Sequence, residues 1–170
     1  MATERQSPDA IAALTGCSPN TLTHITDDPD APDGNWIVAN SNNTNDDIRV
    51  TFPTPTGSPT VGAGLQEFRA YVRQFDTGQT GVPTCRVELW ENGVLVRAGT
   101  NTNVTGAGQI LAFTWNASEL GTADGSLVEC KLVGTKSAGA PSVRNAVDFG
   151  AIEWNVDYTV AAAARYFIIS

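Results

Sequence analysis

The sequence predicts an all-β protein: an antiparallel two-sheet sandwich, jelly-roll-like, with about eight strands and an extended N-terminal arm. β-Branched residues dominate the apolar and small polar positions, with 20 Thr and 15 Val against 9 Leu. Such residues lose rotamer freedom in a helix and fit a pleated surface. The 16 Gly and 9 Pro are scattered along the chain as short strands with turns require. Several windows also alternate apolar and polar residues with the period of a half-buried strand.

The length of 170 residues and the hydrophobic content of 41% fit one domain with one continuous core. The pattern divides the chain into an N-terminal arm over 1–26, a β-sandwich over 27–158 and a C-terminal tail over 159–170.

The N-terminal segment 1–26 has too few apolar side chains to fold alone. Within it, residues 7–14 could form a short helix, with Ser7 as N-cap and Pro8 at the first position. Either its own domain or a neighbouring subunit must then immobilise the segment. An acidic, proline-rich connector over 27–34 leads from it to the first predicted strand.

The sandwich strands follow from alternation between turn signals. The clearest hairpin has Asn92-Gly93 between two alternating runs, because both residues tolerate positive φ. In the last strand, Asp148 and Gly150 interrupt the apolar face, which predicts a bulge. The predicted strands are 35–39, 47–52, 64–75, 85–90, 94–96, 109–115, 127–133 and 145–158.

The tail is mixed, since 160–164 favours a helix and 166–169 favours a strand. Its apolar end, Phe167-Ile168-Ile169, is poorly soluble if exposed. It therefore either adds a strand to this domain or packs on a partner.

The charge excludes several classes of partner. Ten Lys and Arg against 18 Asp and Glu give a net charge of −8. Binding to nucleic acid or to anionic membrane needs clustered basic residues, so we expect neither. No run reaches the roughly 18 apolar residues of a membrane helix, and the first ten residues do not resemble a secretion signal.

No motif in the chain indicates a reaction, so we expect no enzyme, no catalytic residue and no cofactor. The single histidine, His24, cannot act with a catalytic serine, because the sequence has no Gly-x-Ser-x-Gly elbow. Cys-His catalysis with Cys17 is not expected either, because both residues lie in a segment without a rigid scaffold. The acidic residues of the strands fit outward-facing charge better than a hydrolase pair. These residues are Glu67, Glu88, Glu129 and Glu153.

Metal and thiol chemistry are equally weak. The aspartates of the connector resemble a calcium loop, but Pro29 and Pro32 break its spacing, so a rigid solvated linker is the better interpretation and no metal site is expected. Cys85 and Cys130 alternate with charged neighbours and are expected to be buried thiols.

The four tryptophans allow a second kind of function. Trp36, Trp90, Trp115 and Trp154 either pack in the core or form a platform on which sugar rings stack. Since Trp90 and Trp154 have charged or polar neighbours, one of them could be exposed.

Four phrases of the sequence carry a family resemblance: 28–36 (DPDAPDGNW), 47–55 (DIRVTFPTP), 62–69 (GAGLQEFR) and 150–155 (GAIEWN). Over roughly 9–158 the chain resembles small β-sandwich virion structural proteins of tailed bacteriophages, of the capsid decoration or cement type. The resemblance implies a non-enzymatic protein that binds and stabilises the shell on the capsid exterior, after assembly in the host cytoplasm.

The partners that this resemblance implies are the phage major capsid protein or other virion subunits, and further copies of the chain in a homo-oligomer such as a trimer. The alternative is a head or tail fibre domain, or a carbohydrate-binding module, that recognises glycans through exposed aromatics. The contact residues expected for the virion reading lie in the arm and the tail: Ile11, Leu14, Leu22, Ile25, Tyr166, Phe167, Ile168 and Ile169.

Overall fold

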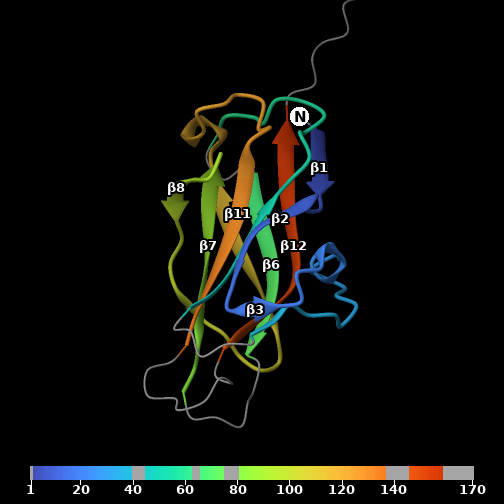
Figure 1. Ribbon diagram of the computed structural model, residues 1–170. Helices are drawn as coiled ribbons and strands as arrows, with labels where there is room; N and C mark the ends of the chain where they lie inside the picture. The colour runs from blue at the N-terminus through green and yellow to red at the C-terminus, as the bar shows by residue number, and fades with distance from the viewer. Residues whose placement is uncertain (1, 40–44, 63–65, 75–80, 137–145, 159–170) are drawn as a thin grey trace, which may run out of the picture.

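Two antiparallel sheets packed face to face form the protein in the computed structural model, which describes residues 2–39, 45–62, 66–74, 81–136 and 146–158 (Figure 1). The smaller sheet has the strand order β1-β12-β6-β10. The larger has the order β2-β5-β11-β7-β8, with β9 also paired to β7, and β3 pairs with β4 in a short ladder. The predicted all-β sandwich is therefore confirmed.

The strands agree closely with the alternation in the sequence. The predicted bulge is also present, as a register shift between Phe149 and Ala151. None of the described residues forms a helix long and apolar enough to cross a membrane. The elements are β1 (Ala2–Gln6), β2 (Ala10–Thr15), β3 (Cys17–Ser18), η1 (Leu22–His24), β4 (Val38–Ala39), β5 (Asn45–Thr51), β6 (Gln66–Gln74), β7 (Thr84–Glu91), β8 (Val94–Ala98), β9 (Thr102–Asn103), β10 (Gln109–Trp115), η2 (Ala117–Glu119), β11 (Val128–Thr135) and β12 (Val147–Tyr158).

The N-terminal segment is extended and lies within the sandwich. β1 pairs with β12 at one edge of the smaller sheet, and β2 pairs with β5 at one edge of the larger sheet. The chain thus passes from one sheet to the other between Gln6 and Ala10. The protein's own domain immobilises this segment, and the short helix expected over 7–14 is wrong: strand pairing with β5 outweighs the local N-cap signal.

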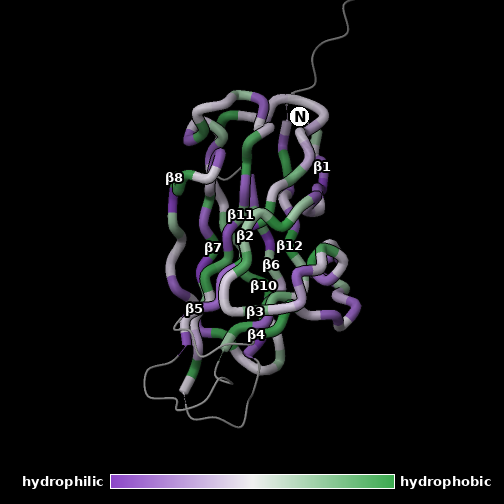
Figure 2. Tube along the Cα trace, in the orientation of Figure 1, coloured by the Kyte–Doolittle hydropathy of each residue, from purple (hydrophilic) through white to green (hydrophobic). Residues whose placement is uncertain are grey.

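The core lies between the two sheets, where alternate residues of strands such as β5 and β6 are buried. Figure 2 shows hydrophobic and hydrophilic residues interspersed along the strands. Phe68 stands at its centre, with the ring of Phe52 stacked at a centroid distance of 5.6 Å and that of Trp115 at 5.5 Å. Trp154 meets Phe68 edge-on at 6.2 Å. Trp115 and Trp154 are therefore core residues, which leaves Trp36 and Trp90 as the candidates for a surface role.

The β7–β8 hairpin confirms the Asn-Gly prediction. Asn92 has φ 49° and Gly93 has φ 77°, the left-handed pair that a tight hairpin turn requires. An L side chain at Gly93 would be strained because of this positive φ. Space is available, since the atom that an added Cβ would meet among the described residues is Arg49 Nη1, at 3.8 Å.

Replacing Gly93 by alanine should therefore lower the free energy of unfolding by about 1 kcal/mol through backbone strain alone. Urea unfolding of Gly93→Ala beside Gly34→Ala, another positive-φ glycine with open space around it, checks this. If Gly93→Ala lowered the free energy of unfolding and Gly34→Ala did not, backbone strain would not be the common cause.

Candidate functional site

The outer face of the larger sheet gathers charged side chains around Trp90. Across three adjacent strands, Arg49 of β5 stands opposite Lys131 of β11, which stands opposite Glu88 of β7. Trp90 lies two residues further along β7, opposite Glu129. Side chains two residues apart on a strand share a face, so alternation alone brings these five groups together. We call Arg49, Glu88, Trp90, Glu129 and Lys131 the Trp90 face.

The indole of Trp90 is half-buried and held in one orientation. Its Nε1–H donates to Glu88 Oε2 at 2.8 Å. The Arg49 guanidinium carbon lies 5.0 Å from the ring centroid and Lys131 Nζ lies 5.3 Å from it. Cations at this distance are attracted by the quadrupole of the ring. The ring is therefore fixed among donors and acceptors before any ligand arrives.

The charges of the Trp90 face are balanced by partners within the molecule. Glu129 also accepts a hydrogen bond from the backbone N–H of Gly93 at 3.1 Å, which ties the face to the hairpin turn. Carboxylates held by cations in this way accept hydrogen bonds, so the arrangement suits non-covalent recognition. The ion pairs are Arg86–Glu88 at 2.7 Å, Arg49–Glu129 at 3.6 Å and Lys131–Asp47 at 3.0 Å.

The other half-buried tryptophan, Trp36, lies on the smaller sheet and is packed more tightly. The Arg73 guanidinium carbon is 4.0 Å from its ring centroid, and the Tyr71 ring is 5.3 Å away. Its benzene ring also fills the space above Gly150, where an added Cβ would lie 2.8 Å from Cζ3. Because Gly150 has no side chain, the Trp36 ring can pack directly against the bulge of β12. This contact holds the end of the connector against β12.

The acidic connector is held by arginines of β1 and β6. Asp30 receives Arg69 on both oxygens, at 2.7 and 2.8 Å, and Arg69 also bonds Glu153 at 2.8 Å. Asp28 accepts from Arg5 at 2.9 Å. Across the described ranges, no group of three or more His, Cys, Asp or Glu side chains could hold a metal ion.

The histidine and the cysteines have structural positions. His24 Nδ1 lies 3.0 Å from the carbonyl oxygen of Trp36, and the two residues flank the connector. Cys17, Cys85 and Cys130 are free and buried, which confirms the expectation for the last two. Burial, with Asp46 and Asp47 acting in the same direction, raises the pKa of the Cys17 thiol to about 12, so this sulfur stays protonated.

The expected contact residues divide into three groups. Ile25 is completely buried in the molecule's own core. Ile11, Leu14 and Leu22 are partly buried and pack against that core, so each presents only part of its side chain to a partner. Tyr166, Phe167, Ile168 and Ile169 lie outside the described residues.

One buried acid was not recognised from the sequence. Asp46 points inward from β5 in the same alternation as Ile48 and Val50, and it is completely buried. Neither of its side-chain oxygens has a hydrogen-bond partner within the described structure. Burial raises its pKa to about 7, with Asp47 and Asp148 acting in the same direction and Lys136 opposing it. The shared parity with Ile48 was the signal that could have identified it.

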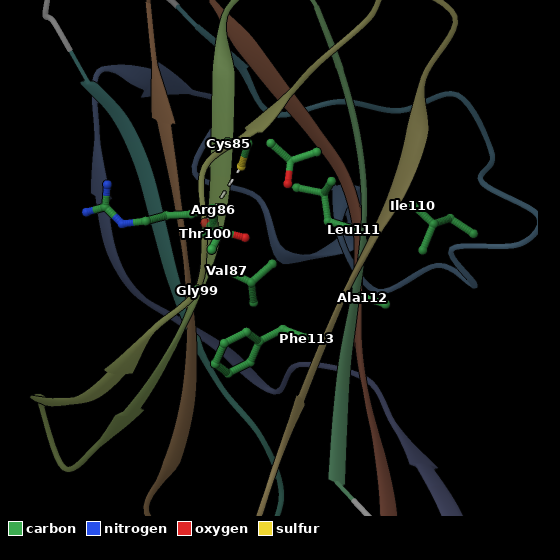
Figure 3. Close-up of a pocket in the computed structure, with 10 residues that line it drawn as sticks. Cys85, Arg86, Val87, Gly99, Thr100, Ile110, Leu111, Ala112 and Phe113 are labelled. Atoms are coloured by element: carbon green, nitrogen blue, oxygen red, sulfur yellow. Dashed lines mark hydrogen bonds between the residues drawn. The ribbon is translucent and has the colours of Figure 1, made fainter. Parts of the chain in front are cut away.

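A cavity of about 230 Å³ opens between the two sheets on the side where β10 faces β7, β9 and the loop before β9 (Figure 3). Val87 and Cys85 point into it from β7, and Leu111 and Phe113 point into it from β10. Arg86 and Ile110 point away from it. Thr100 and Thr102 also line the cavity, which is thus a groove of mixed polar and apolar character along the open side of the sandwich, separate from the Trp90 face.

Comparisons with known proteins give only loose likenesses. No family model and no curated protein matches the chain. The C-terminal CBM6 of LamC, a marine laminarinase from Zobellia galactanivorans, is 9% identical with a TM-score of 0.44, over 92% of this chain and 100% of that one. The CBM22-1 xylan-binding domain of Xyn10C from Paenibacillus barcinonensis is 10% identical with a TM-score of 0.38, over 92% and 95%.

A third similar structure is dimeric latent PorU from Porphyromonas gingivalis, 11% identical with a TM-score of 0.39, over 91% of this chain and 12% of that one. Likenesses at this level assign no ligand and no activity to the chain. The strand order alone shows the architecture: this chain is a β-sandwich of two antiparallel sheets.

Proposed function

We propose that this protein is a non-enzymatic recognition module that binds carbohydrate on the Trp90 face, with the indole of Trp90 stacking against a sugar ring. The observation that carries the proposal is the orientation of that indole, which Glu88 fixes through Nε1 while cations lie 5.0 and 5.3 Å from its centroid. A sugar presents an apolar C–H face and a rim of hydroxyls. An amphipathic ring bordered by placed donors and acceptors complements both.

Trp90 is preferred to Trp36 because of what contacts each ring. Trp36 is wedged over the backbone of Gly150 and has Arg73 at 4.0 Å. The cations beside Trp90 lie about 1 Å farther from its centroid. Both rings are only half-buried, so each sheet offers one tryptophan that a glycan could contact. Substituting Trp36 and Trp90 one at a time tests the two sites separately.

The test is a glycan array probed with the full chain, followed by titration of the best ligand. We expect Trp90→Ala to raise the Kd at least about tenfold, because a central aromatic contact contributes about 2 kcal/mol to binding. Trp36→Ala is the matched control and should leave the Kd unchanged. Near-ultraviolet circular dichroism of both variants checks that the sandwich is intact.

Two results would contradict the proposal. One is an array with no bound glycan at any position. The other is loss of binding in Trp36→Ala with full binding in Trp90→Ala, which would move recognition to the smaller sheet.

A structural subunit of a phage virion is the second candidate, and one observation favours it. Three of the phrases that carry the sequence resemblance meet on the smaller sheet, through Asp30, Arg69 and Glu153. Three of the four phrases thus meet at one group of ion pairs, while 47–55 belongs to β5 of the larger sheet and the loop after it. Such a subunit would bind the shell from outside and associate with further copies of itself.

Cosedimentation of the full chain with isolated phage capsids separates the two candidates. A decoration protein should pellet with the shells and Trp90→Ala should pellet equally well. A chain that stays in the supernatant at every ratio of protein to shell would contradict the virion candidate.

A further inference from the structure

We propose that β10 is a dimerisation edge, on which a second copy of this chain adds its own β10 in antiparallel orientation and joins the two smaller sheets into one. The inference is independent of both candidate functions, because it follows from the edges of the sheets, and the Trp90 face lies on the larger sheet. It rests on three features of β10: an edge without protection, free backbone groups along it, and complementarity of that edge to its own copy.

β10 differs from the other edge strands of the described sheets because it has no feature that blocks pairing. Natural edges are kept from pairing by charged side chains, bulges, proline or very short strands. β1 carries Glu4 and Arg5, and β9 has two residues. β2 has a bulge next to Ile11, and β8 carries Arg97. β10 has seven residues, QILAFTW, without charge, proline or register shift, and is therefore the edge most open to another strand.

The backbone groups that are free along this edge follow from the neighbouring ladders. Ile152 of β12 sends its N–H away from β6, to the carbonyl oxygen of Ile25 at 2.9 Å. In an antiparallel ladder alternate residues point to opposite sides, so the partner of Ile152, Ala70, points its backbone groups toward β10. Leu111 pairs with Ala70 and points back toward it. The residues on either side of Leu111 therefore point to the free edge.

Ile110, Ala112 and Thr114 are those edge residues. The side chain of Arg97 agrees with this direction, because its guanidinium donates to the carbonyl oxygen of Thr114. Within the described part of the chain, no strand pairs with β10 on this side. The edge thus presents its N–H and C=O groups to an added strand, and the Thr114 oxygen has a second lone pair with which to accept from it.

This edge is complementary to its own copy. A two-fold axis at Ala112 places this residue opposite Ala112 of the second copy, and places Ile110 of each copy opposite Thr114 of the other. In this register every edge residue exchanges both N–H···O bonds with its partner. A residue near the axis faces its own copy, so a charge there would be repelled, and β10 carries none. Ala112 is also small and exposed, so the two strands can approach.

The inward side chains of β10 fit the same register. Between the hydrogen-bonded pairs, Leu111 of each copy lies opposite Phe113 of the other, at a separation where cross-strand side chains touch. Both side chains point into the groove between β10 and β7 (Figure 3). Phe113 is only partly buried in the single chain. Dimerisation therefore removes apolar surface from water at the groove as well as pairing the edge.

Sedimentation velocity of the full chain over a concentration series tests the proposal. One strand pairing buries less area than a standard interface, so we expect a reversible dimer with a Kd on the order of 10 µM. Ala112→Lys should raise that Kd at least about 100-fold, because two ammonium groups would face each other at the axis. Ala10→Lys, the same change at an exposed position of the β2 edge, is the matched control and should leave the Kd unchanged.

A charge exchange separates loss of the interface from loss of the fold. Ala112→Asp alone should weaken the dimer as Ala112→Lys does, whereas an equimolar mixture of the two variants should dimerise again, since opposite charges then meet at the axis. In hydrogen exchange measured by NMR, the amides of Ile110 and Ala112 should exchange fast in the dilute monomer and slowly in the dimer.

An unaltered chain that stays monomeric up to about 1 mM, a hundredfold above the expected Kd, would overturn the proposal. So would a dimer that survives Ala112→Lys, or a mixture of the two charged variants that stays monomeric, because the interface would then lie elsewhere. Slow exchange of Ile110 and Ala112 in the monomer would assign the edge to another segment of the same chain and would also overturn the proposal.

Discussion

Replacing Phe68 by alanine should lower the free energy of unfolding by about 3–5 kcal/mol, the cost of removing a buried phenyl ring. Phe68 is 0% exposed, and its ring joins Phe52, which follows β5 of the larger sheet, to Trp115 and Trp154 of its own sheet. Large aromatic neighbours on several sides cannot collapse into the space, so most of the cavity remains. Because domains of this size are stable by only about 5–15 kcal/mol, the variant should be close to unfolding.

Urea unfolding followed by tryptophan fluorescence measures the effect of Phe68→Ala. Val61→Ala is the control, since Val61 is 66% exposed and its truncation should change stability by less than about 0.5 kcal/mol. A loss below about 1 kcal/mol at Phe68 would show that the two sheets do not pack through this ring.

Replacing Asp46 by asparagine should stabilise the protein at pH 8 by about 2–4 kcal/mol. The carboxyl is fully buried without a hydrogen-bond partner in the described structure, and its pKa is raised to about 7 from an ordinary 3.8. Above pH 7 the folded protein must hold a buried negative charge. A tenfold change in proton affinity corresponds to about 1.4 kcal/mol, so the rise in the pKa of Asp46 sets the upper end of the range.

The sign of the pH dependence follows from proton binding. Between about pH 4 and pH 7 the folded state keeps the proton on Asp46 and the unfolded state loses it. Stability contributed by this group is therefore greatest below pH 4, falls as the pH rises to 7, and stays low above it.

Urea midpoints at pH 5 and pH 8 check both statements. The unaltered chain should lose stability between these values, whereas Asp46→Asn should lose much less. Asp124→Asn is the control, because hydrogen bonds from Ser126 lower the pKa of that carboxyl and its removal should not stabilise the protein. If the stability of the unaltered chain and that of Asp46→Asn depended equally on pH, the negative charge on Asp46 would be compensated in the folded protein.

Alternation predicted the sandwich strands because one face of each strand is buried. The series Ile48, Val50 and Phe52 identified β5 with bounds close to those observed. The N-terminal strands were not predicted, since β1 reads Ala-Thr-Glu-Arg-Gln and half of β2 is alanine. Edge strands of this kind are held by backbone pairing with distant partners, which local patterns do not reveal.

The candidate site was predictable only in part. The sequence identified Trp90 as one of two tryptophans with polar neighbours, but not which of them faces solvent. That choice depends on packing: Trp154 points between the sheets, and Trp90 lies on the outer face of β7. The groove beside β10 left no local signal, because it forms between strands that are far apart in the sequence.

The pairing of β1 with β12 sets the order in which the protein can be completed. Ala2 lies opposite Tyr158, so β1 leaves the ribosome long before β12, the strand with which it pairs, has been made. Such distant pairings close slowly, since the entropy of a large loop is lost before the contacts form. In a nascent chain stalled before residue 154, β1 would have no strand to pair with. Its free backbone groups could then bind chaperones or other nascent chains.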